Sequence, residues 1–331
     1  MTRRRLSQRQ QARIGAIQEK RKQHFDLRAQ DALASAADDS SREGCVISRH
    51  GQHLAIADAE GVVHHCLSRQ SIGEPVCGDR VIWQRTTPGQ GVVTALRDRI
   101  SVLTRPTYGG TEKPLAANLD RLVIVLAPEP VPSHYLLDQY LVAAENLGIG
   151  AVIALNKSDL VDQSGVAEFT REFGHYEKIG YPLVRVSAKF EHQLEPLIDQ
   201  LRSHTSILVG QSGVGKSSLV NALLPDMDIQ TGRLSHATRM GRHTTSTASL
   251  YTLPQGGYLI DSPGVRSFRL NQMNIRQLEK GFREFQPFIG RCRFSNCSHV
   301  HEPDCALIAA AEQQLIHPRR LENFRHMAGS L

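Results

Sequence analysis

The sequence predicts an α/β domain with a parallel sheet, preceded by a small β-barrel and followed by a mainly helical domain that holds a metal ion. Three observations support this prediction. Apolar runs alternate with amphipathic segments between residues 122 and 210, which is typical of strands joined by crossover helices. Short β-rich runs fill residues 44–105, and three of the six cysteines crowd between residues 292 and 305. We therefore expect domains of different classes in one chain.

The composition limits the possible classes of protein. The chain has 331 residues, 40% of them hydrophobic, which suffices for two or three domains of roughly 100–150 residues. No apolar run approaches the ~20 residues of a membrane helix, and the N-terminus lacks an apolar secretory segment. Six cysteines are too few for a disulfide scaffold of this length. We expect a cytoplasmic monomer without a membrane partner.

Residues 1–43 are predicted to form a mobile basic arm. The formal net charge is +6, and residues 1–28 hold nine Lys or Arg against two acidic residues, with almost no apolar periodicity. Such a segment can bind nucleic-acid phosphates by releasing counterions. The alternative is a solvated tail that only aids solubility.

Residues 44–105 are predicted to form a small β-barrel that binds RNA. The runs GCVISRHGQHLAIAD, GVVHHCLS and DRVIWQR are short, rich in strand formers and separated by glycine-containing turns. Closely spaced strands fit an OB-fold, with an SH3-like barrel as the alternative. Cys45, Cys66 and Cys77 follow no ligand spacing, so we interpret them as core or surface thiols.

Residues 106–273 are predicted to form the α/β domain. The segments LVIVLA (122–127), AVIALN (151–156), LVRVSA (183–188) and SILVG (206–210) are apolar runs of the kind buried in parallel sheets. Between them, YLLDQYLVAAENLG and LEPLIDQLRS have the pattern of crossover helices. A ligand of such a domain binds at the carboxyl ends of the strands.

A phosphate-binding loop follows the last of these strands. The segment GQSGVGKSS satisfies G-x-x-x-x-G-K-[ST] between an apolar strand and the helix SSLVNALL. Glycines let backbone N–H groups surround the phosphates, Lys216 reaches the β and γ phosphates, and Ser217 ligates Mg²⁺. The predicted phosphate-binding residues are Gly210, Gln211, Ser212, Gly213, Val214, Gly215, Lys216, Ser217 and Ser218.

Guanine rather than adenine is predicted as the base. In NKSD, Asn156 can bond the purine, Lys157 can lie along the ring, and Asp159 can accept from the two N–H donors that adenine lacks. The tripeptide SAK ends the next strand and consists of Ser187, Ala188 and Lys189. The N–H of Ala188 can approach the guanine carbonyl oxygen. NKSD alone could be a helix N-cap, but both motifs beside a phosphate loop predict a GTP site.

Further nucleotide contacts are predicted after the phosphate loop. In DSPG (261–264), Asp261 would hold Mg²⁺ through water, and the Gly264 N–H would bind the γ phosphate. Residues 231–249 are polar, glycine-containing and poor in helix formers, which favours a mobile switch. Thr245, or its neighbour Thr244, would close on Mg²⁺ and the γ phosphate in the GTP state.

The order of these motifs is rotated. In an ordinary small GTPase the phosphate loop precedes the base-reading loop, whereas here NKSD and SAK precede the phosphate loop, the switch and DSPG. The ordinary order is cut just after DSPG, and close-lying termini make such a circular permutation tolerable. The segment after DSPG then runs directly into the C-terminal domain.

Residues 274–331 are predicted to form a small zinc-binding domain. Cys292, Cys297, His299 and Cys305 follow the spacing C-x4-C-x-H-x5-C. Three thiolates and one imidazole suit a closed, tetrahedral structural zinc site. His301 is the alternative imidazole ligand, and the cysteines could also stay without a metal.

These motifs together resemble the small ribosomal subunit biogenesis GTPases of the RsgA type. NKSD, SAK, GQSGVGKSS, GRHTTS, DSPG and the cysteine–histidine cluster occur in the family's order, and the resemblance covers the chain past the arm. It implies an OB-fold domain, a circularly permuted GTPase domain and a C-terminal zinc domain. It also implies hydrolysis of GTP to GDP and phosphate, stimulated by the small ribosomal subunit and its rRNA late in subunit maturation.

One catalytic group is missing from its usual place. Many GTPases orient the attacking water with a Gln directly after the D-x-x-G glycine, and this chain has Val265 there. The resemblance points to His243 in GRHTTS as the replacement, with Lys216 and Thr245 completing the catalytic set. The alternative for His243 is an exposed loop histidine or one that touches rRNA.

Two other functions remain open on the sequence alone. The same fold could be an RNA-binding checkpoint that uses the GTP or GDP state as a signal with little turnover. It could also be a GTPase of another RNA or metallocentre pathway.

Overall fold

The computed structural model describes residues 23, 26–34, 40–106, 112–226, 248–262 and 273–330. The chain divides into two units, one of residues 1–100 and 228–250, the other of residues 101–227 and 251–331. Among the described residues, no helix is long and apolar enough to cross a membrane.

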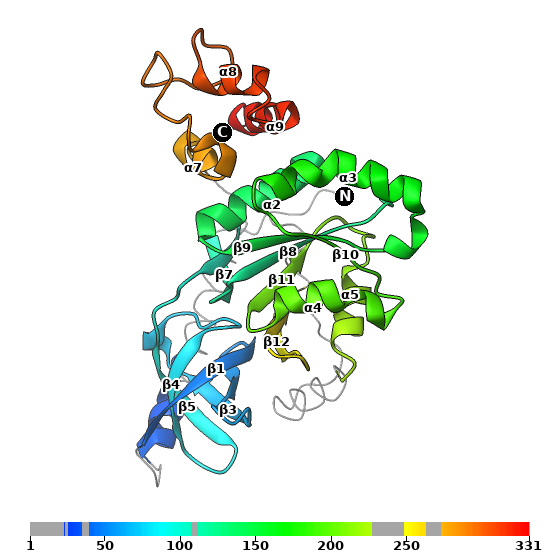
Figure 1. The fold of residues 1–331 in the computed structure, drawn as a ribbon. Helices are drawn as coiled ribbons and strands as arrows, with labels where there is room; N and C mark the ends of the chain where they lie inside the picture. Colours follow the sequence, from blue (N-terminus) through cyan, green and yellow to red (C-terminus); the bar gives the residue numbers. More distant parts are fainter. Residues whose placement is uncertain are drawn as a thin grey trace, which may run out of the picture. The chain divides into compact units, whose positions relative to one another are not determined.

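The first unit contains a closed five-stranded barrel. Its strands are β1 (Ser41–His50), β2 (His53–Ala57), β3 (Val63–Ser68), β4 (Arg80–Arg85) and β5 (Gln90–Leu96). Strands β1, β2 and β3 pair antiparallel in sequence, and β3 pairs parallel with β5. β5 then pairs antiparallel with β4, and β4 with β1, which closes the ring (Figure 1). The predicted OB-like barrel is confirmed.

The barrel core is apolar. Trp83 is fully buried and packs against Val46, Leu54, Ile56, Cys66, Val81 and Val93. A Cβ on Gly91 would lie 2.6 Å from a ring carbon of Trp83, so a side chain there would displace the indole. Cys66 and Cys77 are buried free thiols, and burial raises the pKa of the half-buried Cys45 to about 11. Cys66 and Cys77 are therefore core thiols, one of the two interpretations made from the sequence.

The predicted mobile arm differs from the structure at two places. Residues 26–34 form a helix in which Ala29 is fully buried, so this part of the arm is folded. Strand β1 begins at Ser41, two residues before the predicted end of the arm at residue 43. Residues 1–22, 24–25 and 35–39 lie outside the described part of the chain.

The second unit contains a parallel sheet. Its parallel strands are β8 (Arg121–Leu126), β9 (Gly150–Leu155), β10 (Leu183–Arg185), β11 (Thr205–Val209) and β13 (Tyr258–Asp261). The spatial order is β10-β9-β8-β11-β13, followed by β12 (Ser249–Thr252). Each predicted apolar run overlaps one of these strands. A hairpin of β6 (Val102–Pro106) and β7 (Glu112–Ala117) precedes them.

Helices cover both faces of this sheet. They are α2 (His134–Leu147), α3 (Gln163–Lys178), α4 (Glu195–Leu201) and α5 (Lys216–Leu223). Figure 1 shows α2 and α3 on one side and α4 and α5 on the other. Helix α3 was not predicted, because its buried stripe consists only of Phe169, Phe173 and Tyr176 in a polar segment.

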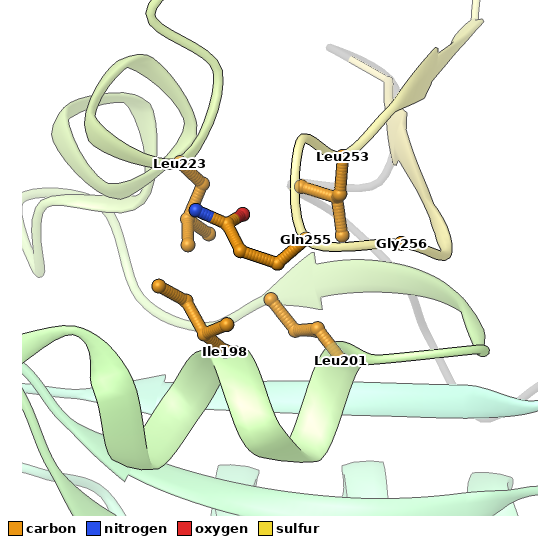
Figure 2. A pocket seen from close by; sticks show the side chains of 6 residues that line it. All are labelled: Ile198, Leu201, Leu223, Leu253, Gln255 and Gly256. Carbon is orange, nitrogen blue, oxygen red and sulfur yellow. The ribbon is translucent and has the colours of Figure 1, made fainter.

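A small apolar hollow lies between α4, α5 and the turn after β12. Its lining residues are Ile198, Leu201, Leu223, Leu253, Gln255 and Gly256 (Figure 2). The hollow is too narrow to hold a water molecule, and no predicted nucleotide or metal residue lines it. The hollow is therefore separate from the candidate sites.

The end of the second unit is mainly helical. It contains α7 (Ile275–Lys280), α8 (Ala306–Glu312) and α9 (Pro318–Ala328). Their shared core consists of Leu278, Phe282, Phe285, Cys305, Leu307, Ala310, Ile316, Leu321, Phe324 and Met327, together with Val142 of α2. The C-terminal helices thus share a core with the sheet domain.

Candidate nucleotide and metal sites

The phosphate loop lies between β11 and α5, and its glycines adopt backbone angles that favour glycine. Gly210 has φ 141°, and a Cβ there would lie 2.3 Å from the Val125 carbonyl oxygen. Gly213 and Gly215 both have φ 89°. Lys216 Nζ donates to the carbonyl oxygens of Gly210 at 2.7 Å and of Gln211 at 2.6 Å. The ammonium group therefore lies over the loop, where a phosphate would compete for it.

The hydroxyl-bearing residues of the loop are accessible. Ser217 and Ser218 are exposed in the first turn of α5, and Ser212 is exposed in the loop itself. Val214, in contrast, is fully buried and offers only its backbone to a ligand. The loop therefore presents hydroxyls and backbone groups to solvent, which is the chemistry that phosphate and Mg²⁺ need.

Asn156 joins the phosphate loop to the SAK motif. It is 1% exposed at the end of β9, where Nδ2 donates to the Val214 carbonyl oxygen at 2.9 Å. Its Oδ1 accepts from the Ala188 N–H at 3.2 Å. The sequence interpretation gave Asn156 a purine contact, and an amide has a second N–H that can still make one. The loop-joining contacts add a scaffolding role that the motif alone did not reveal.

Lys157 also contacts the phosphate loop. It has φ 60°, and its Nζ donates to the carbonyl oxygens of Glu129 at 2.9 Å and of Gly213 at 2.8 Å. Its ammonium group is thereby held against two loops, and the alkyl stem leads to it. This arrangement provides an apolar strip along which a base can lie.

The Asp159 carboxylate is held by the SAK motif. Ser187 Oγ donates to Asp159 Oδ1 at 2.6 Å, and Ser187 Oγ accepts from the Lys189 N–H at 3.3 Å. A carboxylate has about four acceptor positions, so Asp159 can still accept from the two donors of guanine. NKSD, SAK and the phosphate loop thus meet at the carboxyl edge of the sheet.

Asp261 lies at the same edge. It ends β13, which pairs parallel with β11, the strand that leads into the phosphate loop. Its side chain is exposed. The other predicted groups around the γ phosphate, which are His243, Thr245 and Gly264, lie outside the described residues, as does Val265.

Helix α2 makes two contacts with the phosphate loop that the motifs did not predict. The Ser133 N–H donates to Gln211 Oε1 at 3.3 Å, and Ser133 Oγ caps α2. The Tyr140 hydroxyl accepts from the Gly210 N–H, while burial raises the pKa of Tyr140. No local sequence signal marks these contacts, because both depend on the packing of α2 against the sheet.

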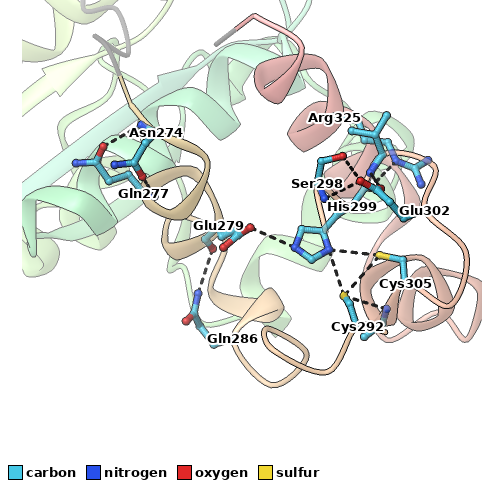
Figure 3. Close-up of polar contacts among 12 residues, drawn as sticks. Asn274, Gln277, Glu279, Gln286, Cys292, Ser298, His299, Glu302, Cys305 and Arg325 are labelled. Carbon is cyan, nitrogen blue, oxygen red and sulfur yellow. Dashed lines mark hydrogen bonds and ion pairs between the residues drawn. The ribbon is translucent and has the colours of Figure 1, made fainter. Parts of the chain in front are cut away.

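The C-terminal cysteine–histidine cluster brings together the four predicted ligands. One ligand atom from each of Cys292, Cys297, His299 and Cys305 lies within 4.8 Å of the others. His299 Nδ1 is 3.4 Å from Cys292 Sγ and 3.3 Å from Cys305 Sγ (Figure 3). His301, the alternative imidazole, is exposed and is not one of the four. Three soft thiols and one imidazole at this separation fit one tetrahedral metal ion.

A buried ion network joins the C-terminal helices to the sheet domain. Arg320 of α9 donates to Asp138 Oδ1 of α2 at 2.6 Å and to Glu284 Oε1 at 2.6 Å. Asn323 and Tyr176 also donate to Asp138, at 2.6 Å and 2.8 Å. The side chains of Asp138, Arg320 and Glu284 are 0%, 1% and 6% exposed. Asp138 within the apolar run YLLDQYLVAA was the signal that could have revealed this network.

Comparison with known proteins agrees with this geometry. The family model described as RsgA GTPase matches residues 96–271. A relative from Pseudomonas aeruginosa strain UCBPP-PA14 is named small ribosomal subunit biogenesis GTPase RsgA. It is 44% identical to this chain, and the match covers 100% of this chain and 98% of the relative. A relative of the same name from Azotobacter vinelandii is 43% identical, with the same coverage of both chains.

Two solved structures share the fold. The crystal structure of YjeQ from Thermotoga maritima has a TM-score of 0.74 at 32% identity, covering 88% of this chain and 99% of that one. YloQ, described as a circularly permuted GTPase, has a TM-score of 0.72 at 26% identity, covering 89% and 96%. The rotated motif order is thus a circular permutation of the GTPase fold. With the nucleotide motifs gathered at one sheet edge and the family model matched, this chain belongs to the RsgA family of GTPases.

Proposed function

We propose that this chain hydrolyses GTP to GDP and phosphate when it is bound to the small ribosomal subunit, and that it acts late in the maturation of that subunit. The relatives named small ribosomal subunit biogenesis GTPase match the whole chain, which supports the choice of subunit. The observation that carries the GTPase assignment is the meeting of NKSD, SAK and the phosphate loop through Asn156. The OB-like barrel and the basic arm are proposed to bind rRNA.

In this proposal, the described residues bind guanine and the phosphates. Asp159 accepts from guanine's two N–H donors, Asn156 contacts the purine, and Lys157 lies along the ring. The Ala188 N–H exchanges Asn156 Oδ1 for the guanine carbonyl oxygen. The loop residues 210–218 surround the phosphates, and binding transfers the Lys216 ammonium from backbone carbonyls to phosphate oxygens. This transfer is favourable because a phosphate is a charged acceptor.

Magnesium fits the donors present at this edge. The exposed Ser217 hydroxyl and the Asp261 carboxylate are oxygen donors of the kind Mg²⁺ prefers, and we assign Thr245 as a further ligand. When bound, Mg²⁺ neutralises charge on the phosphate oxygens. Gly264 is proposed to donate its N–H to the γ phosphate.

We assign the positioning of the attacking water to His243. Val265 has no polar group for this task, and a histidine can hold a water by hydrogen bonding. We propose that binding to the small subunit brings His243 to the attacking water, so the free enzyme is slow and the bound enzyme fast.

Single-turnover hydrolysis with and without saturating small subunits tests this proposal. Removal of one positioning side chain typically costs ~10²–10⁴-fold, so His243→Ala should lose the stimulated rate and keep GTP affinity and subunit binding. Thr245→Ala is the comparison variant and should also weaken GTP-dependent subunit binding. Wild-type rates for His243→Ala on saturating subunits would show that the catalytic group comes from elsewhere. A wild-type protein that stays slow on the subunit would instead favour the checkpoint function.

We propose zinc as the resident ion of the cysteine–histidine cluster, because three thiolates and one imidazole match a structural zinc site. We also propose a cytoplasmic monomer with an RNA-binding barrel at residues 44–105, a GTPase domain at 106–273 and a zinc domain at 274–331. Light scattering tests the oligomeric state, and limited proteolysis tests the boundaries. Co-sedimentation with ribosomal subunits in a non-hydrolysable GTP analogue tests the partner.

A further inference from the structure

The two ring nitrogens of His299 face different chemical groups. Nδ1 points at the thiols, 3.4 Å from Cys292 Sγ and 3.3 Å from Cys305 Sγ. Nε2 points the other way and lies 3.2 Å from Glu279 Oε1 (Figure 3). The His299 and Glu279 side chains are only 6% and 13% exposed. The carboxylate is therefore placed against the ring with little competition from water.

Glu279 is presented by a firmly capped helix. It lies on α7, whose first turn is closed by a capping box in which Asn274 and Gln277 bond each other's backbone N–H. Leu278, the preceding residue, is in the shared core, and Gln286 Nε2 donates to the Glu279 carbonyl oxygen at 3.1 Å. The position of the carboxylate is thus set by the helix rather than by the metal loop.

The backbone around His299 is held by other residues. The Glu302 carboxylate accepts from the N–H groups of Ser298 at 2.8 Å, Val300 at 3.0 Å and His301 at 3.2 Å. It also accepts from the Ser298 hydroxyl, and these hydrogen bonds lower the pKa of Glu302. Arg325 Nε donates to the His299 carbonyl oxygen at 3.1 Å. Since these contacts fix the backbone, Glu279 acts on the His299 ring alone.

We propose that Glu279 is the positioning residue of the metal site, which fixes His299 as an Nδ1 ligand. An ionised carboxylate only accepts hydrogen bonds, so Nε2 must carry the ring proton of neutral His299. The lone pair of Nδ1 then faces the thiols and is available to the metal. Such carboxylate partners orient the ring and raise the basicity of the ligand nitrogen.

This contact also attaches the metal loop to the helix that follows DSPG. Helix α7 begins at Ile275, shortly after residues 261–264, and it supplies Leu278 to the shared core. Through Glu279 and His299, the metal site is therefore part of the packing of α7. The inference rests on the proposed metal site and not on the proposed GTPase mechanism.

Zinc affinity of the full-length protein, measured by competition with a chromophoric chelator, tests the inference. Loss of an outer-shell partner typically costs about 10–100-fold in metal affinity, which we expect for Glu279→Ala. Glu279→Gln keeps an acceptor oxygen and should therefore lose less zinc affinity than Glu279→Ala. Glu322→Gln, an exposed carboxylate on α9, is the matched control and should bind zinc as the wild type does.

A second readout does not depend on affinity. In ¹⁵N-histidine spectra of the zinc-loaded protein, His299 should show a metal-bound Nδ1 and a protonated Nε2. Zinc on Nε2, or equal affinity for Glu279→Ala and the wild type, would overturn the inference while leaving the metal site intact. A wild-type protein that binds no Zn²⁺ would overturn both the inference and the proposed zinc site, whereas GTP hydrolysis is measured separately.

Discussion

The nucleotide site takes its polar groups from strand ends between residues 156 and 261, whereas the metal site takes its ligands from residues 292–305. In the former, Asn156 and Lys157 already bond the phosphate loop, so the sheet and its side chains hold the loops in place. In the latter, four ligands converge in a loop with little regular structure, held from outside by α7 and α9. The nucleotide motifs are thus held by the sheet and its loops, whereas the cysteine–histidine cluster lies in a loop whose folding we propose to depend on its metal ion. The following predictions test that difference.

Loss of a metal ligand should have the largest effect. Cys297→Ser should remove roughly one equivalent of zinc and loosen the C-terminal helices, since structural zinc contributes ~10–16 kcal/mol in zinc-finger peptides at pH 7. Nucleotide binding should largely survive, because the sheet holds that site. Elemental analysis and GDP titration are the measurements, with Cys66→Ser as a control for a buried thiol outside the cluster. Equal loss of zinc and nucleotide affinity would contradict the separation of the two sites.

Loss of the base-reading carboxylate should affect only the nucleotide site. Asp159→Asn removes the negative charge and replaces one acceptor oxygen with a donor that faces the guanine amine, so two charge-assisted hydrogen bonds worth about 1.5–3 kcal/mol each are lost or weakened and GTP binding should weaken ~10²–10⁴-fold. Xanthosine nucleotides should gain affinity, because their ring has an oxygen where guanine has an amine. Titration with both nucleotides measures the switch, and zinc content should not change. Unchanged GTP affinity would show that Asp159 does not read the base.

The buried ion network of Arg320 should contribute more to the free energy of unfolding than the exposed ion pair of Arg319. Arg320→Met leaves Asp138 and Glu284 buried without their cation, a loss of about 3–5 kcal/mol. Arg319 pairs with Glu172 at 3.1 Å, and both side chains are nearly half exposed, so Arg319→Gln should cost about 0–1 kcal/mol. Denaturant unfolding compares the two variants. Equal losses would mean that the network does not hold the C-terminal helices on α2.

Acid should lower the free energy of unfolding by the smallest amount, through histidines between the C-terminal helices and the sheet domain. The His175 ring stacks on His317 with centroids 3.9 Å apart, and burial, followed by the charges of His317 and Arg320, lowers the pKa of His175 to about 3. Burial also lowers the pKa values of His134 and His317. Because the unfolded histidines bind protons first, this stability is complete above pH 6.5 and decreases as the pH falls towards 3.

The loss from His175 alone should be ~1 kcal/mol at one pH unit below its unfolded pKa. Unfolding between pH 7.5 and pH 5.5 measures it. His175→Gln removes the titrating ring and should flatten the dependence, whereas His192→Gln at an exposed position should not. A pH profile that is the same in all three proteins would show that the stack does not control acid stability.

The sequence by itself determined the motifs whose chemistry depends on local spacing. GQSGVGKSS specifies a phosphate loop because its glycines must adopt backbone angles that side chains disfavour, as Gly210 and Gly215 do. The spacing of Cys292, Cys297, His299 and Cys305 specified a single cluster because a short loop keeps its members within reach. The apolar runs specified the buried strands, and the rotated order of the motifs identified the circular permutation. Apart from the motif order, which compares segments between residues 156 and 264, each of these signals is contained in a short stretch of consecutive residues.

Only the tertiary structure decided which distant side chains complete these sites. Asn156 bonds a carbonyl 58 residues away, and Arg320 bonds Asp138 across 182 residues. Glu279 contacts His299 through the packing of α7, although no spacing rule links a helix carboxylate to a metal loop. Such contacts pair polar groups that burial would otherwise leave unsatisfied, and the need for pairing arises only when the chain has folded around them. The sequence shows which polar side chains are present, but their hydrogen-bond partners depend on which surfaces the folded chain buries.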